Sequence, residues 1–273
     1  MSVITISRGS FSHGKEVGEK LAARLNYQFV DREVLLEASR EYNISEIKLH
    51  KAIFDTPSFL DRFLYRKEKY VAFIQSVVLK HLREDNVVYC GFAGHFFVRD
   101  VPHVLKVRII ADVEDRARIV MERDGATQKE ALETLRHMDD QRTKWSKLLY
   151  GIDTRDPANY DLVLHIHSLS VDDVVDIVAH AVSLDRMKST PESQQKMENL
   201  YLASLVKAAL VEFHPDAEVE ADRGEVLVKL SATFSSTAGR DVQKVTEMAL
   251  KVPGVRDARV EILETETYYS GRI

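Results

Sequence analysis

The residues best suited to chemistry lie in a loop near the N-terminus, residues 8–16, directly after a short apolar segment. In this phosphate loop, Gly9 and the pair Gly14-Lys15 have the spacing of a backbone turn that wraps around phosphate groups. Glycines tolerate the φ angles that point successive N–H groups inward, and the lysine adds positive charge for the outer phosphates. The loop therefore predicts a nucleotide ligand. The residues expected to contact it are Arg8, Gly9, Ser10, Ser12, His13, Gly14, Lys15 and Glu16.

The segments on either side of the loop occur in the order that anion binding requires. Residues 3–6 predict a β-strand, and Val17 and Leu21 fit a helix over residues 16–26 whose N-terminus faces the same anion. Glu16 stands where a Ser or Thr hydroxyl would normally ligate Mg²⁺. Its carboxylate could reach the metal through water or could help to begin the helix, where acidic residues are favoured.

A second predicted strand, residues 28–31, ends at Asp31 and is followed by Arg32. Ligands bind at the carboxyl ends of parallel strands. We therefore expect Asp31 to contact a substrate hydroxyl or a metal-bound water, and Arg32 to hold an acceptor phosphate through two hydrogen bonds. The alternative is a helix cap and a surface ion pair. The presence of the phosphate loop favours the functional interpretation.

Arginines follow the fourth predicted strand and also lie along the long helix after it. Phosphoryl transfer spreads negative charge over oxygen atoms, and a helical lid that carries arginines would stabilise this charge while excluding water. We expect Arg116, Arg123 and Arg142 to make these contacts. Together with Lys15 they form the predicted catalytic set. Carboxylates nearby allow the alternative of local ion pairing without a ligand.

Two further features are open to more than one interpretation. Gly91 and Gly94 follow the third predicted strand, where backbone freedom could let a substrate approach closely or could form a tight turn. His165 and His167 share one face of the fifth predicted strand, which suggests a metal site. Because no Cys or carboxylate lies at ligand spacing from them, the sequence disfavours that site.

The alternation of strands and helices predicts a doubly wound α/β layer with a parallel sheet. The predicted strands span residues 3–6, 28–31, 87–90, 104–111 and 161–166. The predicted helices span residues 16–26, 57–83 and 127–150, a segment that begins after residue 112, and a segment that ends near residue 184. A capping box at Thr127 and Glu130 marks the start of the helix predicted over residues 127–150.

The chain changes character after residue 184. Residues 185–196 are polar and contain a proline, which predicts a linker. The elements predicted beyond it are a helix over 197–213, strands over 217–222 and 225–232, a helix over 238–251 and a strand over 255–263. The sequence thus predicts one domain over residues 1–184, a linker over 185–196 and a small αββαβ domain over 197–273.

The composition limits the classes of binding partner and the cellular compartment that are expected. The 273 residues carry a formal net charge of −5 and a sequence pI of about 6.1, so nucleic acid and anionic membrane are disfavoured as partners. The single cysteine suits a reducing compartment, and no uncharged apolar run is long enough to span a bilayer. The sequence therefore predicts a cytoplasmic protein without a membrane partner. Both a monomer and a homo-oligomer are compatible with it.

In combination, these motifs resemble the cytidylate kinase-like family of nucleoside monophosphate kinases, which have the P-loop kinase fold. The matching segments are residues 4–8, 14–18, 29–33, 139–142 and 159–162, within a resemblance that spans about residues 1–183. The resemblance implies a five-stranded parallel sheet flanked by helices, ATP with Mg²⁺, and γ-phosphoryl transfer to CMP or a related acceptor. In this family an acidic residue at the position of Glu16 is usual. The family's loop usually has more glycine, so Phe11 and His13 are expected to narrow or reshape the cradle.

The C-terminal unit is faintly similar to a BON domain through residues 224–228 and 252–256, which implies at most a binding or regulatory role. Two functions therefore remain. The favoured one is an ATP-dependent phosphotransferase, a nucleoside monophosphate (CMP-like) kinase that takes a nucleotide and a small-molecule phosphate acceptor. The alternative is a catalytically weak or inactive nucleotide-binding regulator that signals through the C-terminal domain.

Overall fold

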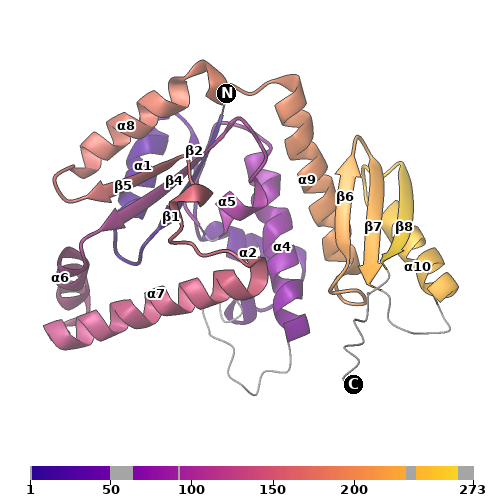
Figure 1. Ribbon diagram of the computed structural model, residues 1–273, viewed down its shortest axis with the longest axis horizontal. Coiled ribbons are helices and arrows are strands. Elements are labelled where there is room, and N and C mark those ends of the chain that lie inside the picture. The colour runs from indigo at the N-terminus through magenta and orange to yellow at the C-terminus, as the bar shows by residue number, and fades with distance from the viewer. Residues whose placement is uncertain (1, 50–63, 92, 232–237, 264–273) are drawn as a thin grey trace, which may run out of the picture.

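The computed structural model describes residues 2–49, 64–91, 93–231 and 238–263. These residues form a five-stranded parallel sheet with helices on both faces and a smaller three-stranded sheet toward the C-terminal end (Figure 1). The expected fold class is confirmed. Among the described helices, none combines the length and the apolar character that a bilayer crossing needs.

The large sheet places the loop after its central strand at a crevice. Its strands are β1 (Val3–Arg8), β2 (Gln28–Val30), β3 (Val87–Tyr89), β4 (Val104–Ala111) and β5 (Leu162–Ile166). They lie in the order β2-β3-β1-β4-β5, and all neighbouring pairs are parallel. Because β1 continues to β3 on one side and β4 on the other, the order reverses at β1, where α/β sheets bind their ligands.

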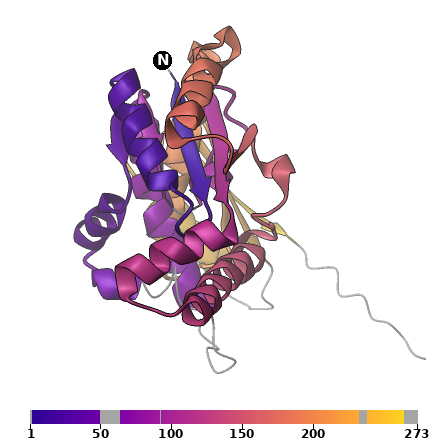
Figure 2. The same cartoon turned by 90° about the vertical axis from the view of Figure 1, so that its left-hand side faces the viewer.

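Helices cover the sheet on two faces and at one end. One face packs against α1 (Gly14–Leu25) and α8 (Val171–Ser183) through apolar residues such as Val17 and Val178. The other face packs against α2 (Glu33–Glu41), α4 (Leu64–Leu82) and α5 (Gly94–Phe97). The helices α6 (Val113–Asp124) and α7 (Gln128–Tyr150) lie across one end of the sheet (Figure 2).

Local sequence signals predicted most of these helices. The capping box of α7 is present at Thr127 and Glu130, and Gly151 ends the helix with a left-handed φ of 66°. The helix expected over residues 57–83 is described as α4, and residues 57–63 of that prediction lie outside the described residues. Neither α2 nor α5 was predicted from the sequence.

The C-terminal unit has the expected αββαβ order. It consists of α9 (Pro191–Leu210), β6 (Glu218–Asp222), β7 (Glu225–Ser231), α10 (Ala238–Leu250) and β8 (Asp257–Leu263). The strands β6 and β7 form an antiparallel hairpin, and β8 adds to β7 in parallel. The similarity to a BON domain stays a prediction.

The helix α9 belongs to both hydrophobic cores. It begins at Pro191, inside the segment expected to be a linker, and the N-cap Thr190 forms a capping box with Ser193. Near its start, Met197 is fully buried in the core of the large sheet. Nine residues later Val206 is fully buried in the core of the small sheet. The only residues between α8 and α9 are 184–190, and the domain boundaries stay a prediction.

Candidate functional site

The phosphate loop is curled. Phe11 and His13 both have left-handed backbone angles, with φ of 59° and 60°, and α1 begins at the next residue, Gly14. A Cβ atom on Gly14 would lie 2.6 Å from the Cβ atom of Arg8, so only glycine fits this turn. The phenyl ring of Phe11 packs against the apolar residues of α6 and α7 and lies beneath the guanidinium of Arg123, 4.6 Å from the ring centroid. The loop therefore has the shape that anion binding needs.

Polar groups of the loop are available for an anion. The Ser10 hydroxyl oxygen is buried and has no hydrogen-bond partner among the described residues. The Ser10 N–H donates to the Asp139 carboxylate at 3.5 Å, so an anionic oxygen already faces the loop. The N–H groups in the first turn of α1 have no carbonyl partner within the helix. These features fit the phosphates of a nucleotide.

Ser12 has a different position from the one expected. Its side chain is 1% exposed, and its hydroxyl lies 3.0 Å from the carbonyl oxygens of both Gly9 and Ile109. Because a hydroxyl has one hydrogen to donate, these carbonyls compete with any phosphate for it. The side chain therefore holds the loop against β4.

Asp31 is buried against two cations of the loop. Its side chain is 7% exposed, and its carboxylate lies 3.4 Å from Arg8 Nη2 and 3.8 Å from Lys15 Nζ. Arg32, rather than Asp31, is the N-cap residue of α2. The alternative of a cap with a surface ion pair therefore does not describe Asp31. Arg8 also donates to the Cys90 sulfur at 2.7 Å, and burial raises the pKa of that thiol to about 11.

Two of the predicted lid arginines contact the loop directly. Arg116 Nε donates to the Ser10 carbonyl at 2.6 Å, and its Nη2 donates to Asp139 at 2.7 Å. Arg142 donates to the Arg8 carbonyl. Burial and the nearby guanidinium groups, among them that of Arg8, lower the pKa of Arg142 to about 10, against the opposing effect of Asp139. The third, Arg123, pairs with its neighbour in sequence and packs on the loop only through the Phe11 ring.

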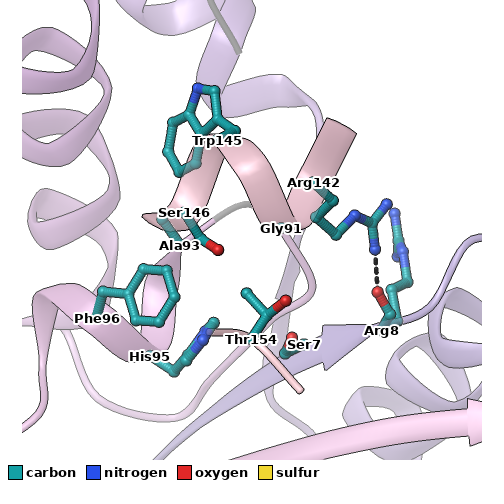
Figure 3. Close-up of a pocket in the computed structure, with 10 residues that line it drawn as sticks. All are labelled: Ser7, Arg8, Gly91, Ala93, His95, Phe96, Arg142, Trp145, Ser146 and Thr154. Atoms are coloured by element: carbon teal, nitrogen blue, oxygen red, sulfur yellow. Dashed lines mark hydrogen bonds between the residues drawn. The ribbon is translucent and has the colours of Figure 1, made fainter. Parts of the chain in front are cut away.

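The loop and the lid enclose a pocket of about 470 Å³. Its lining includes all the predicted phosphate-loop residues except Gly9, and also Glu19, Arg32, Ile119, Arg123, Met138 and Arg142. A smaller, more enclosed pocket of about 70 Å³ adjoins it, because Arg8 and Arg142 line both. Figure 3 shows this second pocket, with the Arg142 guanidinium bonded to Arg8 on one side and His95 and Phe96 on the other.

The two glycines after β3 have a packing role that the sequence did not indicate. Neither has a positive φ, so the interpretation that they need backbone freedom is wrong. Cβ atoms on Gly91 and Gly94 would lie 2.3 Å and 2.4 Å from atoms of the Tyr89 side chain. The missing side chains therefore make room for Tyr89. Gly91 also lines the smaller pocket, which places it beside any ligand there.

Several residues near the site were not predicted. Asp139 bridges the loop and Arg116, and its position three residues before Arg142 on one helix face was a usable signal. Below the smaller pocket, the Tyr160 hydroxyl lies 3.2 Å from Arg108 Nη1 and 3.3 Å from His95 Nε2. Burial and Arg108 lower the pKa of His95 to about 3, so this imidazole is neutral at pH 7.

The predicted metal contact, Glu16, lies on the exposed side of α1. Its two carboxylate oxygens lie 3.2 Å from His13 Nδ1 and 3.4 Å from Lys20 Nζ. A direct bond to Mg²⁺ would break these contacts, whereas a contact through a metal-bound water would leave them in place. The geometry therefore fits the water-mediated role better.

Comparisons with known proteins identify the family of this chain. A model of the cytidylate kinase-like family matches residues 3–168. A cytidylate kinase of Ignicoccus hospitalis is 27% identical over 181 residues, which cover 65% of this chain and 97% of that protein. A cytidylate kinase of Pyrobaculum aerophilum is 26% identical over 178 residues, which cover 65% and 90% of the two chains. In fold alone, the chain is similar to an uncharacterized protein from Eubacterium ventriosum, with a TM-score of 0.50 and 22% identity over 67% of this chain and 98% of the other. Since the family model spans more than half of its residues, the chain belongs to the cytidylate kinase-like family of nucleotide kinases.

Proposed function

We propose that the protein is an ATP-dependent nucleoside monophosphate kinase that phosphorylates CMP or a closely related acceptor. The observation that carries this proposal is the curled loop with cations on both sides of it, in a chain whose net charge is −5. The cations are therefore a local concentration rather than part of a basic surface. The relatives that bear the name cytidylate kinase support CMP as the acceptor.

Each group at the site has a proposed task. Lys15 and the loop N–H groups hold the ATP phosphates, and the unpartnered Ser10 hydroxyl adds a hydrogen bond. Arg116 and Arg142 stabilise the charge that develops during transfer, and the helices that carry them exclude water. Asp31 accepts from the acceptor hydroxyl or from a metal-bound water, and Arg32 holds the acceptor phosphate.

The proposed reaction also needs a nucleotide and a metal ion. When bound, ATP with Mg²⁺ provides the transferable phosphoryl group and part of the charge neutralisation. Glu16 would hold the ion through water, because its carboxylate is already shared by His13 and Lys20. Positioning and electrostatics by the residues above account for the rest, since phosphoryl transfer needs little covalent help from a protein.

The test is steady-state phosphate transfer from ATP to a panel of CMP, dCMP, UMP and AMP. We expect turnover with CMP or dCMP, and a loss of about 10²–10³ in kcat for Lys15→Ala, the usual cost of removing one preorganised donor. Arg24→Ala is the matched control, because it removes an exposed cation from the same helix that pairs with Asp176, away from the phosphate loop. Equal losses in both variants would contradict the proposed role of Lys15.

The alternative, a nucleotide-binding regulator, is favoured by one observation. The helix α9 joins the small sheet to the core beneath the site, which gives a route for a signal. This alternative predicts ATP binding that Lys15→Ala abolishes, with no transfer to any acceptor in the panel. Transfer that depends on Lys15 would exclude it.

A further inference from the structure

Two imidazoles and two carboxylates gather beside the phosphate loop, outside the two pockets described above. His165 Nε2 lies 2.9 Å from Asp112 Oδ1, and His167 Nδ1 lies 2.6 Å from Asp112 Oδ2. Asp112, Asp115 and His167 each offer a ligand atom, and the three atoms lie within 4.8 Å of one another. We call these four residues the His/Asp cluster. Their side chains are between about one third and two thirds exposed, so ions in solution can reach them.

The sheet brings these residues together from distant parts of the sequence. The strands β4 and β5 are parallel with Ala111 opposite Ile166, so Asp112 and His167 leave the sheet next to each other. Asp115 lies three residues further on, in the first turn of α6. The carboxylates that the sequence analysis did not find near the histidines are therefore present, but on a neighbouring strand end.

The side chain of Asp112 does not cap the helix that it precedes. It is the N-cap residue of α6, a position where an Asp side chain normally accepts from a backbone N–H of the first turn. Its side chain makes no such hydrogen bond. Instead, one carboxylate oxygen faces each imidazole. The Asp112 carboxylate thus contacts the two histidines instead of the backbone of α6.

We infer that the His/Asp cluster binds a divalent transition metal ion of the Zn²⁺ class. Imidazole nitrogens with carboxylate oxygens suit Zn²⁺, Co²⁺ or Ni²⁺, whereas Mg²⁺ prefers oxygen ligands and bound water. Ligands about 2.1 Å from a tetrahedral Zn²⁺ lie roughly 3.4 Å apart. The ligand atoms of Asp112, Asp115 and His167 lie within 4.8 Å of one another, and the 2.6 Å separation between Asp112 and His167 would widen, so small side-chain rotations would bring them to this spacing. Arg118, which now pairs with Asp115 at 2.9 Å, would turn to solvent.

A metal here would join the end of β5 to the start of α6. That helix carries Arg116, which holds the phosphate loop through the Ser10 carbonyl. A pocket of about 280 Å³ next to the cluster is lined by Asp115 and by His13 of the loop. The ion would therefore fix the edge of the nucleotide site without contacting the phosphate loop. This inference does not depend on kinase activity, because its readout is metal binding.

The decisive measurement is calorimetric titration of the full chain with Zn²⁺ alone, without nucleotide. The variant His165→Gln/His167→Gln is compared with His137→Gln/His180→Gln, which removes two exposed imidazoles from α7 and α8. Even outer-shell partners of a metal contribute about 10–100-fold to affinity, so we expect at least a ~100-fold weaker Kd after the loss of the ligand His167 together with His165, which contacts Asp112. The control pair should bind Zn²⁺ like the unmodified chain. Equal Zn²⁺ binding by both variants, or no saturable binding by the unmodified chain, would overturn the site.

Two measurements separate a metal site from simple ion pairs between protonated imidazoles and Asp112. Co²⁺ in place of Zn²⁺ should give visible d–d absorption in the unmodified chain, and Asp112→Asn should abolish it. Zn²⁺ should also protect His165 and His167 of the unmodified chain from diethyl pyrocarbonate, while His180 stays reactive. This footprint requires no variant to fold. Modification of all three histidines at equal rates with and without Zn²⁺ would refute the inference.

Discussion

Arg142, like Arg8, lines both pockets. Its guanidinium donates to the Arg8 carbonyl at the end of β1. A guanidinium can bond the backbone and an incoming phosphate at the same time, whereas an ammonium is a single point charge on a flexible stem. The shape of this side chain, and not only its charge, is therefore important at the site.

We predict that Arg142→Lys lowers kcat/KM for phosphate transfer by about 10²-fold, the range seen when one preorganised donor is lost. Arg136→Lys is the matched control, because Arg136 lies on the same helix but is exposed. The measurement is initial-rate kinetics with ATP and the best acceptor. An Arg142→Lys enzyme as active as the control would show that charge alone is sufficient.

His95 makes stability depend on pH. Burial and nearby cations lower the pKa of its imidazole to about 3, well below the ordinary value of about 6.5. The unfolded chain therefore binds a proton at this residue when the folded chain does not, and stability falls as the pH decreases from about 6.5 toward 3. The slope for one proton is at most about 1.4 kcal/mol per pH unit.

We expect His95→Gln to flatten the free energy of unfolding between pH 6 and pH 4, as measured by urea titration at each pH. A direct check is NMR of the His95 ring, whose signals should not titrate between pH 5 and pH 8. The exposed His180 ring serves as an internal reference signal in the same spectra. Titration of His95 near pH 6.5 would contradict the buried, neutral state.

The helix α7 is long, largely exposed and carries much of the lid, so its first turn matters for its stability. The Thr127 hydroxyl accepts from the Glu130 N–H, and the Glu130 carboxylate accepts in return from the Thr127 N–H at 2.8 Å. We predict that Thr127→Ala lowers the free energy of unfolding by about 1 kcal/mol, a typical value for a lost N-cap. Thr134→Ala, at an exposed position inside the same helix, should cost nothing measurable. Thermal unfolding followed by circular dichroism makes the comparison.

Helices and strands with local signals could be predicted from the sequence, and contacts between distant segments could not. The capping box of α7 and the glycine that ends it are local, as is the curled loop before α1. The proximity of Asp139 to Ser10 depends on how α7 crosses the end of the sheet. Likewise, the meeting of Asp112 with His167 depends on the register of β4 and β5.

One error has an instructive physical cause. Proline suggested a break at Pro191, but proline is favoured in the first turn of a helix, where its missing N–H would have no partner. Thr190 before it supplied the N-cap signal. The stretch was therefore a helix start, and its polar residues include the N-cap Thr190 and the buried Ser193 that completes the capping box. Gly91 and Gly94 were likewise misinterpreted, because the reason for glycine at these positions is the Tyr89 ring that packs against them, and the local sequence does not show this contact.

The two cores of the chain should unfold together, because α9 contributes to both. The single tryptophan, Trp145, is buried in the core of the large sheet and reports on it by fluorescence. We predict that Val245→Ala, which removes a fully buried side chain from the core of the small sheet, shifts the Trp145 transition to lower urea. The expected cost is about 1–3 kcal/mol for the lost apolar burial.

Met197→Ala is the companion variant, since Met197 packs in the same core as the tryptophan. Its transition should shift whether or not the two cores are coupled, which makes it a positive control. A Val245→Ala chain with an unchanged tryptophan transition, but a lower midpoint by far-ultraviolet circular dichroism, would show two independent units. The domain division expected from the sequence would then describe folding as well as composition.

The shared helix also determines how force and motion pass through the molecule. A sheet joined by a flexible linker would move independently of the large sheet, whereas a sheet packed on a shared helix moves together with it. A partner that binds β6 or β7 would thus act on the packed pair of helices α4 and α9. Fluorophores placed on the two sheets should accordingly keep a constant energy-transfer efficiency, and the protein should tumble with a single rotational correlation time.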